Sequence, residues 1–99
     1  MTEQEIAATI AAGAKPNKII LFGSRARDGA AEDSDYDLLV VAELPGTPRD
    51  RRRAIRKLFD RPDFSMDLFV LTPMEYELQK SIPNTVSFTA SREGKVLYG

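Results

Sequence analysis

The sequence predicts an α/β (α+β) protein built as a single mixed β-sheet with helices packed on it. Two features of the pattern indicate this fold class. Short apolar runs of strand length alternate with amphipathic segments, and several of those segments begin with a Thr followed three residues later by an acid. The chain has 99 residues, and if it were divided into two domains, each would be too small to bury a stable hydrophobic core. We therefore expect one domain over residues 1–99.

The chain opens with a helix followed by a strand. Thr2 and Glu5 have the spacing of a capping box, and apolar residues recur after them at helical intervals. These signals predict a helix over residues 3–12 with Gly13 near its end. Residues 18–22 are apolar and rich in β-branched side chains, which predicts a short buried strand.

A second strand and a second helix follow. Residues 35–42 begin polar and become apolar, which indicates a strand that ends before the turn around Pro45. Thr47 and Pro48 then announce a helix, which we expect Pro62 to end. Its apolar stripe is expected to comprise Ala54, Ile55, Leu58 and Phe59.

The last third of the chain is expected to hold a strand, two helices and a strand. Residues 65–71 read as a strand, and Thr72 then starts a helix that runs to about Lys80. Apolar residues alternate within 86–90 as in a strand, whereas Asn84 as a cap and Gly94 as a stop indicate a helix, and we favour the helix. Residues 95–98 would add a short final strand.

The composition restricts the chemistry that the chain can perform. It contains no Cys and no His, which excludes disulfides, thiolate or imidazole metal sites, a Cys nucleophile and a His base. Carboxylates and hydroxyls must carry any reaction. The apolar runs are far shorter than the roughly 20 residues of a membrane span, and no signal peptide follows Met1, so the cytoplasm is the expected location.

The charge is unevenly distributed along the chain. The net charge is −1, yet residues 49–61 hold seven Arg and Lys against two Asp, a local charge of +5 that leaves −6 elsewhere. Such a segment suits a polyanionic partner, although it is more often a solvated helix face.

Three aspartates are the candidate metal ligands. Alternate side chains share one face of a strand, so Asp35 and Asp37 are expected to point the same way. Asp67 lies within an apolar run of another strand, where an unpaired charge would be costly. A Mg²⁺ or Mn²⁺ ion would compensate all three. A solvated turn for the first two and a salt bridge to an Arg for Asp67 are the alternatives.

Gly23 and Ser24 directly follow the first predicted strand, twelve residues before Asp35. A Gly allows the backbone to approach a phosphate closely, and backbone N–H groups at the start of a following turn attract anions. Ser24 adds a hydroxyl donor. The pair alone is usually only a turn, but with Asp-x-Asp on the next strand it predicts a phosphate cradle facing a metal site.

These motifs together resemble the signature of the polymerase-beta-type nucleotidyltransferases, and most closely the minimal nucleotidyltransferases (MNT), which are antitoxin-like. The resemblance covers nearly the whole chain. It rests on the segments 23–29, 34–40, 66–73 and, more weakly, 92–98. The sequence departs from the family pattern where Asp28 precedes the Gly that members often place directly after an Arg.

The resemblance implies a role for each of these residues. Asp35 and Asp37 would hold the metal ions that neutralise a triphosphate, and Asp67 would hold one metal and help to deprotonate the acceptor. Gly23 and Ser24 would bind the nucleotide phosphates. Two further side chains beside the cradle, Arg25 and Arg27, suit phosphate or pyrophosphate, although Arg residues in a solvent-facing turn are also common.

The same resemblance implies a magnesium-dependent transfer of AMP from ATP, with release of pyrophosphate. Minimal members act as antitoxins that adenylylate a tyrosine of a small helical HEPN toxin encoded beside them, so protein AMPylation is the leading hypothesis. The alternatives are a module that neutralises a toxin by contact alone, and modification of a nucleic acid or small molecule. The chain lacks the motifs of P-loop and dinucleotide-binding folds.

Overall fold

A mixed β-sheet forms the centre of the protein. The computed structural model describes residues 1–27, 35–60 and 62–99, and within them four strands pair in the order β3-β2-β1-β4. The strands are β1 (Lys18–Phe22), β2 (Tyr36–Val41), β3 (Met66–Leu71) and β4 (Lys95–Tyr98). β1 pairs antiparallel with both β2 and β4, whereas β2 pairs parallel with β3. The prediction of a single mixed sheet with packed helices is confirmed.

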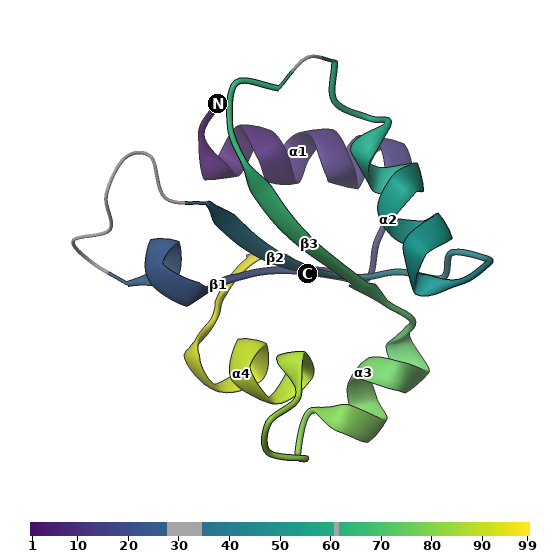
Figure 1. The fold of residues 1–99 in the computed structure, drawn as a ribbon, viewed down its shortest axis with the longest axis vertical. Coiled ribbons are helices and arrows are strands. Elements are labelled where there is room, and N and C mark those ends of the chain that lie inside the picture. Colours follow the sequence, from purple (N-terminus) through teal and green to yellow (C-terminus); the bar gives the residue numbers. More distant parts are fainter. Residues whose placement is uncertain (28–34, 61) are drawn as a thin grey trace.

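Helices cover both faces of the sheet, with α1 and α2 on one face and α3 and α4 on the other (Figure 1). Their bounds are α1 (Glu3–Ala14), α2 (Pro48–Arg56), α3 (Pro73–Gln79) and α4 (Val86–Glu93), and a short 3₁₀ turn, η1 (Gly23–Ala26), follows β1. The capping boxes predicted at Thr2, Thr47 and Thr72 are all formed. The predicted order of helices and strands is therefore confirmed.

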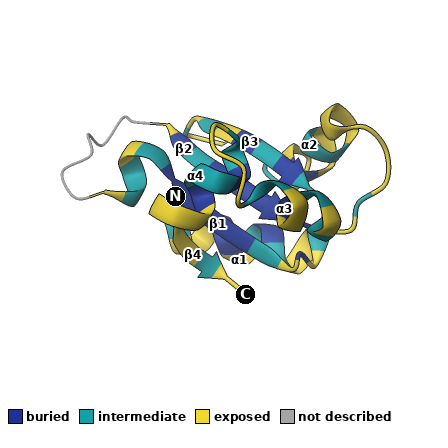
Figure 2. Cartoon of the chain, turned by 90° about the horizontal axis from the view of Figure 1, so that it is seen from below, coloured by how far each residue is buried: buried dark blue, intermediate teal, exposed yellow. Residues whose placement is uncertain are grey.

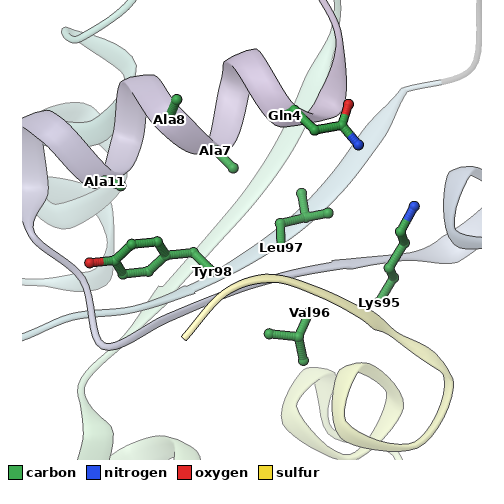
Figure 3. A pocket seen from close by; sticks show the side chains of 8 residues that line it. All are labelled: Gln4, Ala7, Ala8, Ala11, Lys95, Val96, Leu97 and Tyr98. Atoms are coloured by element: carbon green, nitrogen blue, oxygen red, sulfur yellow. The ribbon is translucent and has the colours of Figure 1, made fainter.

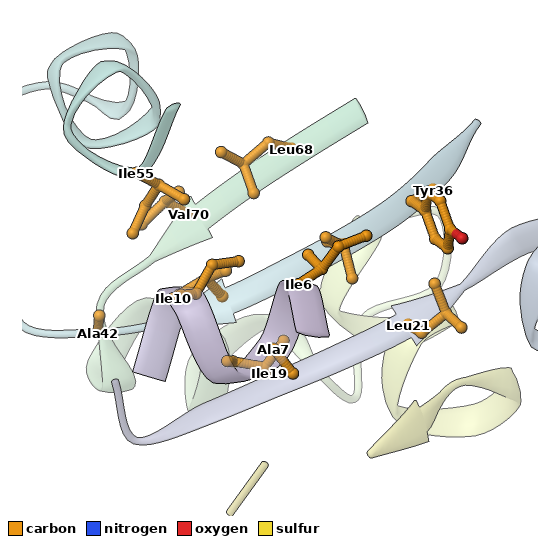
Figure 4. Packing of buried hydrophobic residues seen from close by; sticks show 12 residues of the cluster. Ile6, Ala7, Ile10, Ile19, Leu21, Tyr36, Ala42, Ile55, Leu68 and Val70 are labelled. Atoms are coloured by element: carbon orange, nitrogen blue, oxygen red, sulfur yellow. The ribbon is translucent and has the colours of Figure 1, made fainter. Parts of the chain in front are cut away.

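The central strands β1 and β2 are largely buried because each sheet face packs against its pair of helices, whereas the edge strand β4 is mostly exposed (Figure 2). The larger cluster joins α1 and α2 to the sheet, and many of its side chains are fully buried (Figure 4). Its members include Ile6, Ile10, Ile19, Leu21, Leu38, Val40, Ile55, Leu68 and Val70. The smaller cluster lies under α3 and α4 and is formed by Ile20, Phe22, Leu39, Val41, Tyr76 and Ala90.

Helix α2 ends earlier than the sequence predicts. It stops at Arg56 rather than continuing toward Pro62, because the chain tightens there into turns in which Leu58 N–H donates to the Ile55 carbonyl at 3.0 Å. Leu58 and Phe59 still pack on the larger cluster, but from the turn and not from the helix. The prediction that Leu58 and Phe59 lie on an apolar stripe of the helix was therefore wrong about their helical conformation, although both side chains do pack on the core. Ala54, which was also assigned to the stripe, is exposed.

Two other helix ends differ from the prediction. α1 continues through Gly13 to Ala14, and Lys15 ends it in a left-handed conformation with φ 48°. α4 is capped by the Thr85 side chain, which accepts from Phe88 N–H, while Asn84 adopts φ 69° one residue earlier. The helix favoured for this segment is nevertheless confirmed.

Some sequence features lie outside the described residues, namely the turn at Asp28 and Gly29 and the last cation of the basic segment, Arg61. Among the described helices, none combines the length and the apolar character that crossing a membrane requires.

The core packing predicts a large difference between two Leu→Ala substitutions. Leu38 is 1% exposed in the larger cluster, whereas Leu78 on α3 is 67% exposed. We expect Leu38→Ala to lower the free energy of unfolding by about 2–5 kcal/mol, because it leaves a cavity. Leu78→Ala should change it by less than about 0.5 kcal/mol. Urea denaturation followed by circular dichroism measures both, and equal losses would contradict this assignment of the core.

Candidate functional site

Asp37 lies at the centre of the candidate site because of how β2 is paired. In the antiparallel pair its partner is Phe22, the last residue of β1, and in the parallel pair its partner is Asp67. Neighbouring strands are about 4.8 Å apart, so the two aspartates occupy adjacent positions. Leu39 and Phe69, two residues further along the same strands, pack in the smaller cluster. Alternate residues of a strand share a face, so both aspartates lie on the face of the sheet that α3 and α4 cover.

The pKa of Asp37 is raised above its ordinary value. The main cause is partial burial, which disfavours the charged carboxylate, and the negative charges of Asp67 and Asp35 add to it. The charges of Asp35 and Asp67 therefore both act on the Asp37 carboxylate. A nearby positive charge would relieve this repulsion.

The other two aspartates are more accessible to solvent. Asp35 is exposed and directly precedes β2, and Asp67 is exposed although Leu68 and Val70 of the same strand, on the opposite face, are buried. The burial expected for Asp67 from its apolar neighbours was therefore wrong. In the described parts of the chain, no three acidic side chains already form a ligand set for a metal ion. The role of the trio as metal ligands stays a prediction.

The turn after β1 passes close to Asp37. Gly23 adopts φ 73°, a conformation that L side chains rarely take, and a Cβ atom at this position would collide with Oδ2 of Asp37. The positive φ favours glycine here, and any other residue would also have to displace the Asp37 carboxylate. Ser24 is exposed in η1, and its carbonyl accepts from Arg27 N–H at 3.1 Å. The structure accordingly places Gly23 and Ser24 beside Asp37, where β1 ends and β2 begins.

The two predicted phosphate-binding arginines lie differently. The Arg25 guanidinium stacks 4.2 Å from the centroid of the Tyr36 ring, and its Nη1 donates to the Tyr36 hydroxyl at 3.3 Å. Tyr36 belongs to the larger cluster, on the opposite face from Asp37, so Arg25 has a structural contact there. Arg27 is exposed at the end of η1.

A small hollow of about 160 Å³ adjoins the turn. It is lined by Gly23 and Arg27 on one side and by Thr89 and Glu93 of α4 on the other. Sequence reasoning did not select Thr89 or Glu93. No local motif marks them, since only the packing of α4 against β1 brings them beside Gly23.

A second hollow, of about 560 Å³, lies away from the aspartates. It opens between α1 and β4 and is lined mainly by small and apolar side chains of these two elements (Figure 3). It contains no carboxylate, so it offers no ligand for a metal ion, and we do not include it in the candidate site.

The residues present fit a divalent cation. Carboxylate oxygens are the ligands that Mg²⁺ and Mn²⁺ prefer. Asp37 and Asp67 are adjacent, and their repulsion is the kind that a bound cation offsets. The Asp37 carboxylate lies directly against Gly23, where a larger residue would displace it.

Comparison with known proteins identifies the class of protein. The family model described as "Polymerase beta, Nucleotidyltransferase" matches residues 4–99. The chain therefore belongs to the polymerase beta nucleotidyltransferase family, which confirms the resemblance noted in the sequence and makes nucleotidyl transfer the class of reaction.

Solved structures of toxin–antitoxin proteins share the fold. A mutant of the toxin–antitoxin MntA–HpeT is 22% identical, with a TM-score of 0.65, and the match covers 100% of this chain and 74% of that chain. A toxin–antitoxin with AMP-PNP gives the same identity and TM-score, covering 99% and 74% of the two chains. No curated protein sequence matches the chain.

The raised pKa of Asp37 predicts a pH-dependent stability. The ordinary pKa of this carboxyl is 3.8. As the pH rises above that value, the unfolded chain loses its proton before the folded one, so Asp37 makes the folded state progressively less stable. Asp37→Asn removes this effect. We expect the variant to gain stability relative to wild type between pH 3 and neutral pH, in urea denaturation with EDTA present. This prediction would be contradicted if the difference in free energy of unfolding between the variant and wild type did not change with pH, or if it shifted toward wild type as the pH rises.

Proposed function

We propose that this protein is a metal-dependent nucleotidyltransferase that transfers AMP from ATP to a hydroxyl group of an acceptor. The observation that carries the proposal is the pairing of Asp37 with Asp67 beside the Gly23 turn, in a chain of the polymerase beta nucleotidyltransferase family. The absence of His is compatible with it, because carboxylates and bound cations suffice for this type of displacement.

In this proposal Asp35, Asp37 and Asp67 hold Mg²⁺ or Mn²⁺. When bound, the cations would neutralise the triphosphate and stabilise charge on the attacking and leaving oxygens. The acceptor oxygen forms a bond to the α-phosphorus of ATP, the bond from that phosphorus to its bridging oxygen breaks, and pyrophosphate leaves. Asp67, which is exposed, takes the proton of the acceptor hydroxyl.

The turn after β1 would position the phosphates. Gly23 lets the chain pass close to Asp37, and the exposed Ser24 offers a hydroxyl donor. Arg27 lines the hollow beside Gly23, where its guanidinium suits a phosphate or the departing pyrophosphate. The Arg25 guanidinium is held against the Tyr36 ring, so we assign the phosphate contact to Arg27 before Arg25.

A protein is the acceptor that we propose, and specifically a tyrosine of a small helical toxin of the HEPN type. Three large apolar side chains at four-residue intervals support a protein partner: Met74, Leu78 and Ile82 are 73%, 67% and 51% exposed. α3 covers the same sheet face as Asp37, and exposed apolar patches mark protein interfaces. The similar solved structures are also toxin–antitoxin proteins.

Transfer of label from ATP tests this proposal. The protein is incubated with Mg²⁺ and the helical protein encoded beside it, using ATP labelled in either the α- or the γ-phosphate. We expect only the α-label to reach a tyrosine of the partner. Asp35→Asn should reduce this transfer by about 100-fold or more, because it removes charge that stabilises the transition state. Asp60→Asn, the same change at an exposed aspartate beyond α2, is the matched control and should retain activity.

Three results would contradict the proposal. Transfer of the γ-label would indicate phosphoryl transfer instead, and equal transfer by the Asp35→Asn variant would remove the carboxylates from the reaction. If the Asp35→Asn, Asp67→Asn double variant silenced the toxin as well as wild type does, neutralisation would occur by contact alone.

A further inference from the structure

A strongly basic hollow lies on α2, apart from the candidate site. Its volume is about 410 Å³, and only cationic side chains line it. They are Arg49, Arg52, Arg53, Arg56 and Lys57. Among the residues that the structure describes, neither an acidic nor an apolar side chain contributes to its wall. α2 packs on the same sheet face as α1, so this hollow and Asp37 lie on opposite faces.

The fold accounts for the positions of these cations. Ile55 is fully buried and directs one side of α2 into the core, and Arg51 is tied to Glu75 at 2.7 Å. The lining arginines recur at intervals of three and four residues, which places them along one face of a helix. From Arg49 to Arg56 this face extends about 10.5 Å at 1.5 Å per residue.

The charges in this hollow repel one another. Cations three or four residues apart on a helix destabilise it when no counter-charge intervenes. The acid of this helix, Asp50, offsets part of this repulsion, because it forms the capping box with Thr47 and its charge also acts on Arg49 and Arg53. Within the part of the chain that the structure describes, none of the five lining cations forms a salt bridge, although Arg56 Nη2 donates to the Met66 carbonyl at 3.1 Å. An external anion would therefore stabilise this surface.

The lining indicates which kind of anion fits. The cores of protein–protein interfaces are depleted of charged residues and enriched in aromatic ones, whereas protein–nucleic acid interfaces are strongly positive. A hollow without an apolar anchor matches the second kind. A double helix carries one charge per about 1.7 Å of its axis, so 10.5 Å presents about six phosphate charges to these five cations. No aromatic side chain lines the hollow to stack on bases, so it would contact the backbone and not unpaired bases.

We propose that the basic hollow of α2 binds the phosphate backbone of a double-stranded nucleic acid without sequence selectivity. This site is independent of the nucleotidyl transfer proposed above, because it uses none of the residues of that site. The protein would thus carry a nucleic acid contact on the face of the sheet opposite its aspartates.

Salt-dependent binding of a duplex tests the proposal. Fluorescence anisotropy with labelled 20-base-pair RNA and DNA duplexes gives the affinity at several salt concentrations. With five phosphates neutralised, log K should fall against log salt with a slope of about −4.5. This corresponds to a loss of roughly 500-fold between 50 and 200 mM salt. Duplexes of different sequence should bind equally.

Two triple variants of equal net charge separate a local site from general attraction. Arg49→Gln, Arg52→Gln, Arg53→Gln should reduce the slope to about −2, since each lost contact removes about 0.9. Lys15→Gln, Lys80→Gln, Arg92→Gln removes three cations elsewhere and should leave the slope unchanged. Gln is a good helix former, so α2 should remain folded, and circular dichroism verifies this. The single variant Arg53→Gln should lower the slope by about 0.9.

The proposal also has clear failures. Affinity that does not change with salt, or equal losses in the two triple variants, would overturn it. If poly-L-glutamate bound through α2 while neither duplex did, the hollow would instead fit an acidic protein. Binding of only the RNA or only the DNA duplex would show which nucleic acid the hollow prefers, and would support the proposal.

Discussion

The two opposite pairings of β2 are the constraint on which the candidate site depends. β2 runs antiparallel to β1 and parallel to β3. The last residue of β1 therefore lies beside the first residues of β2 and β3, at the same end of these three strands. Parallel strands require a long crossover, which α2 and its flanking turns supply between β2 and β3. A different pairing of β3 would separate Asp67 from Asp37, even with every helix and strand intact.

This geometry places like charges together at a partly buried position, which opposes the stability of the free protein. Partial burial and the neighbouring carboxylates raise the pKa of Asp37, and the lack of a side chain at Gly23 lets its carboxylate lie directly against the turn after β1. Such an arrangement is costly in a purely structural element and useful where a cation and a phosphate are to be bound. The basic hollow on α2 presents the opposite charge on the other face. The sheet and α2 therefore lie between the two charged surfaces of the protein.

The order of the elements could be predicted from sequence because their signals are local. Thr caps with an acid three residues later start three of the helices, and each strand coincides with a short apolar run. The candidate aspartates and the Gly23 turn were also predicted, from spacing and resemblance. What depends on contacts between distant segments could not be predicted. Asp67 is exposed while its neighbour Leu68 on the other face is buried, which depends on how the helices cover each face, and the placement of Thr89 and Glu93 follows from the packing of α4.

Calorimetric titration with a non-hydrolysable ATP analogue, with and without Mg²⁺, tests the central claim most directly. The claim is that the paired carboxylates of β2 and β3 bind a nucleotide through divalent ions. It predicts saturable uptake by the wild-type protein that requires Mg²⁺ and is lost in the Asp37→Asn, Asp67→Asn double variant, while Asp60→Asn behaves as wild type. Uptake that is equally strong with EDTA, or that survives in the double variant, would show that these carboxylates do not form the nucleotide site.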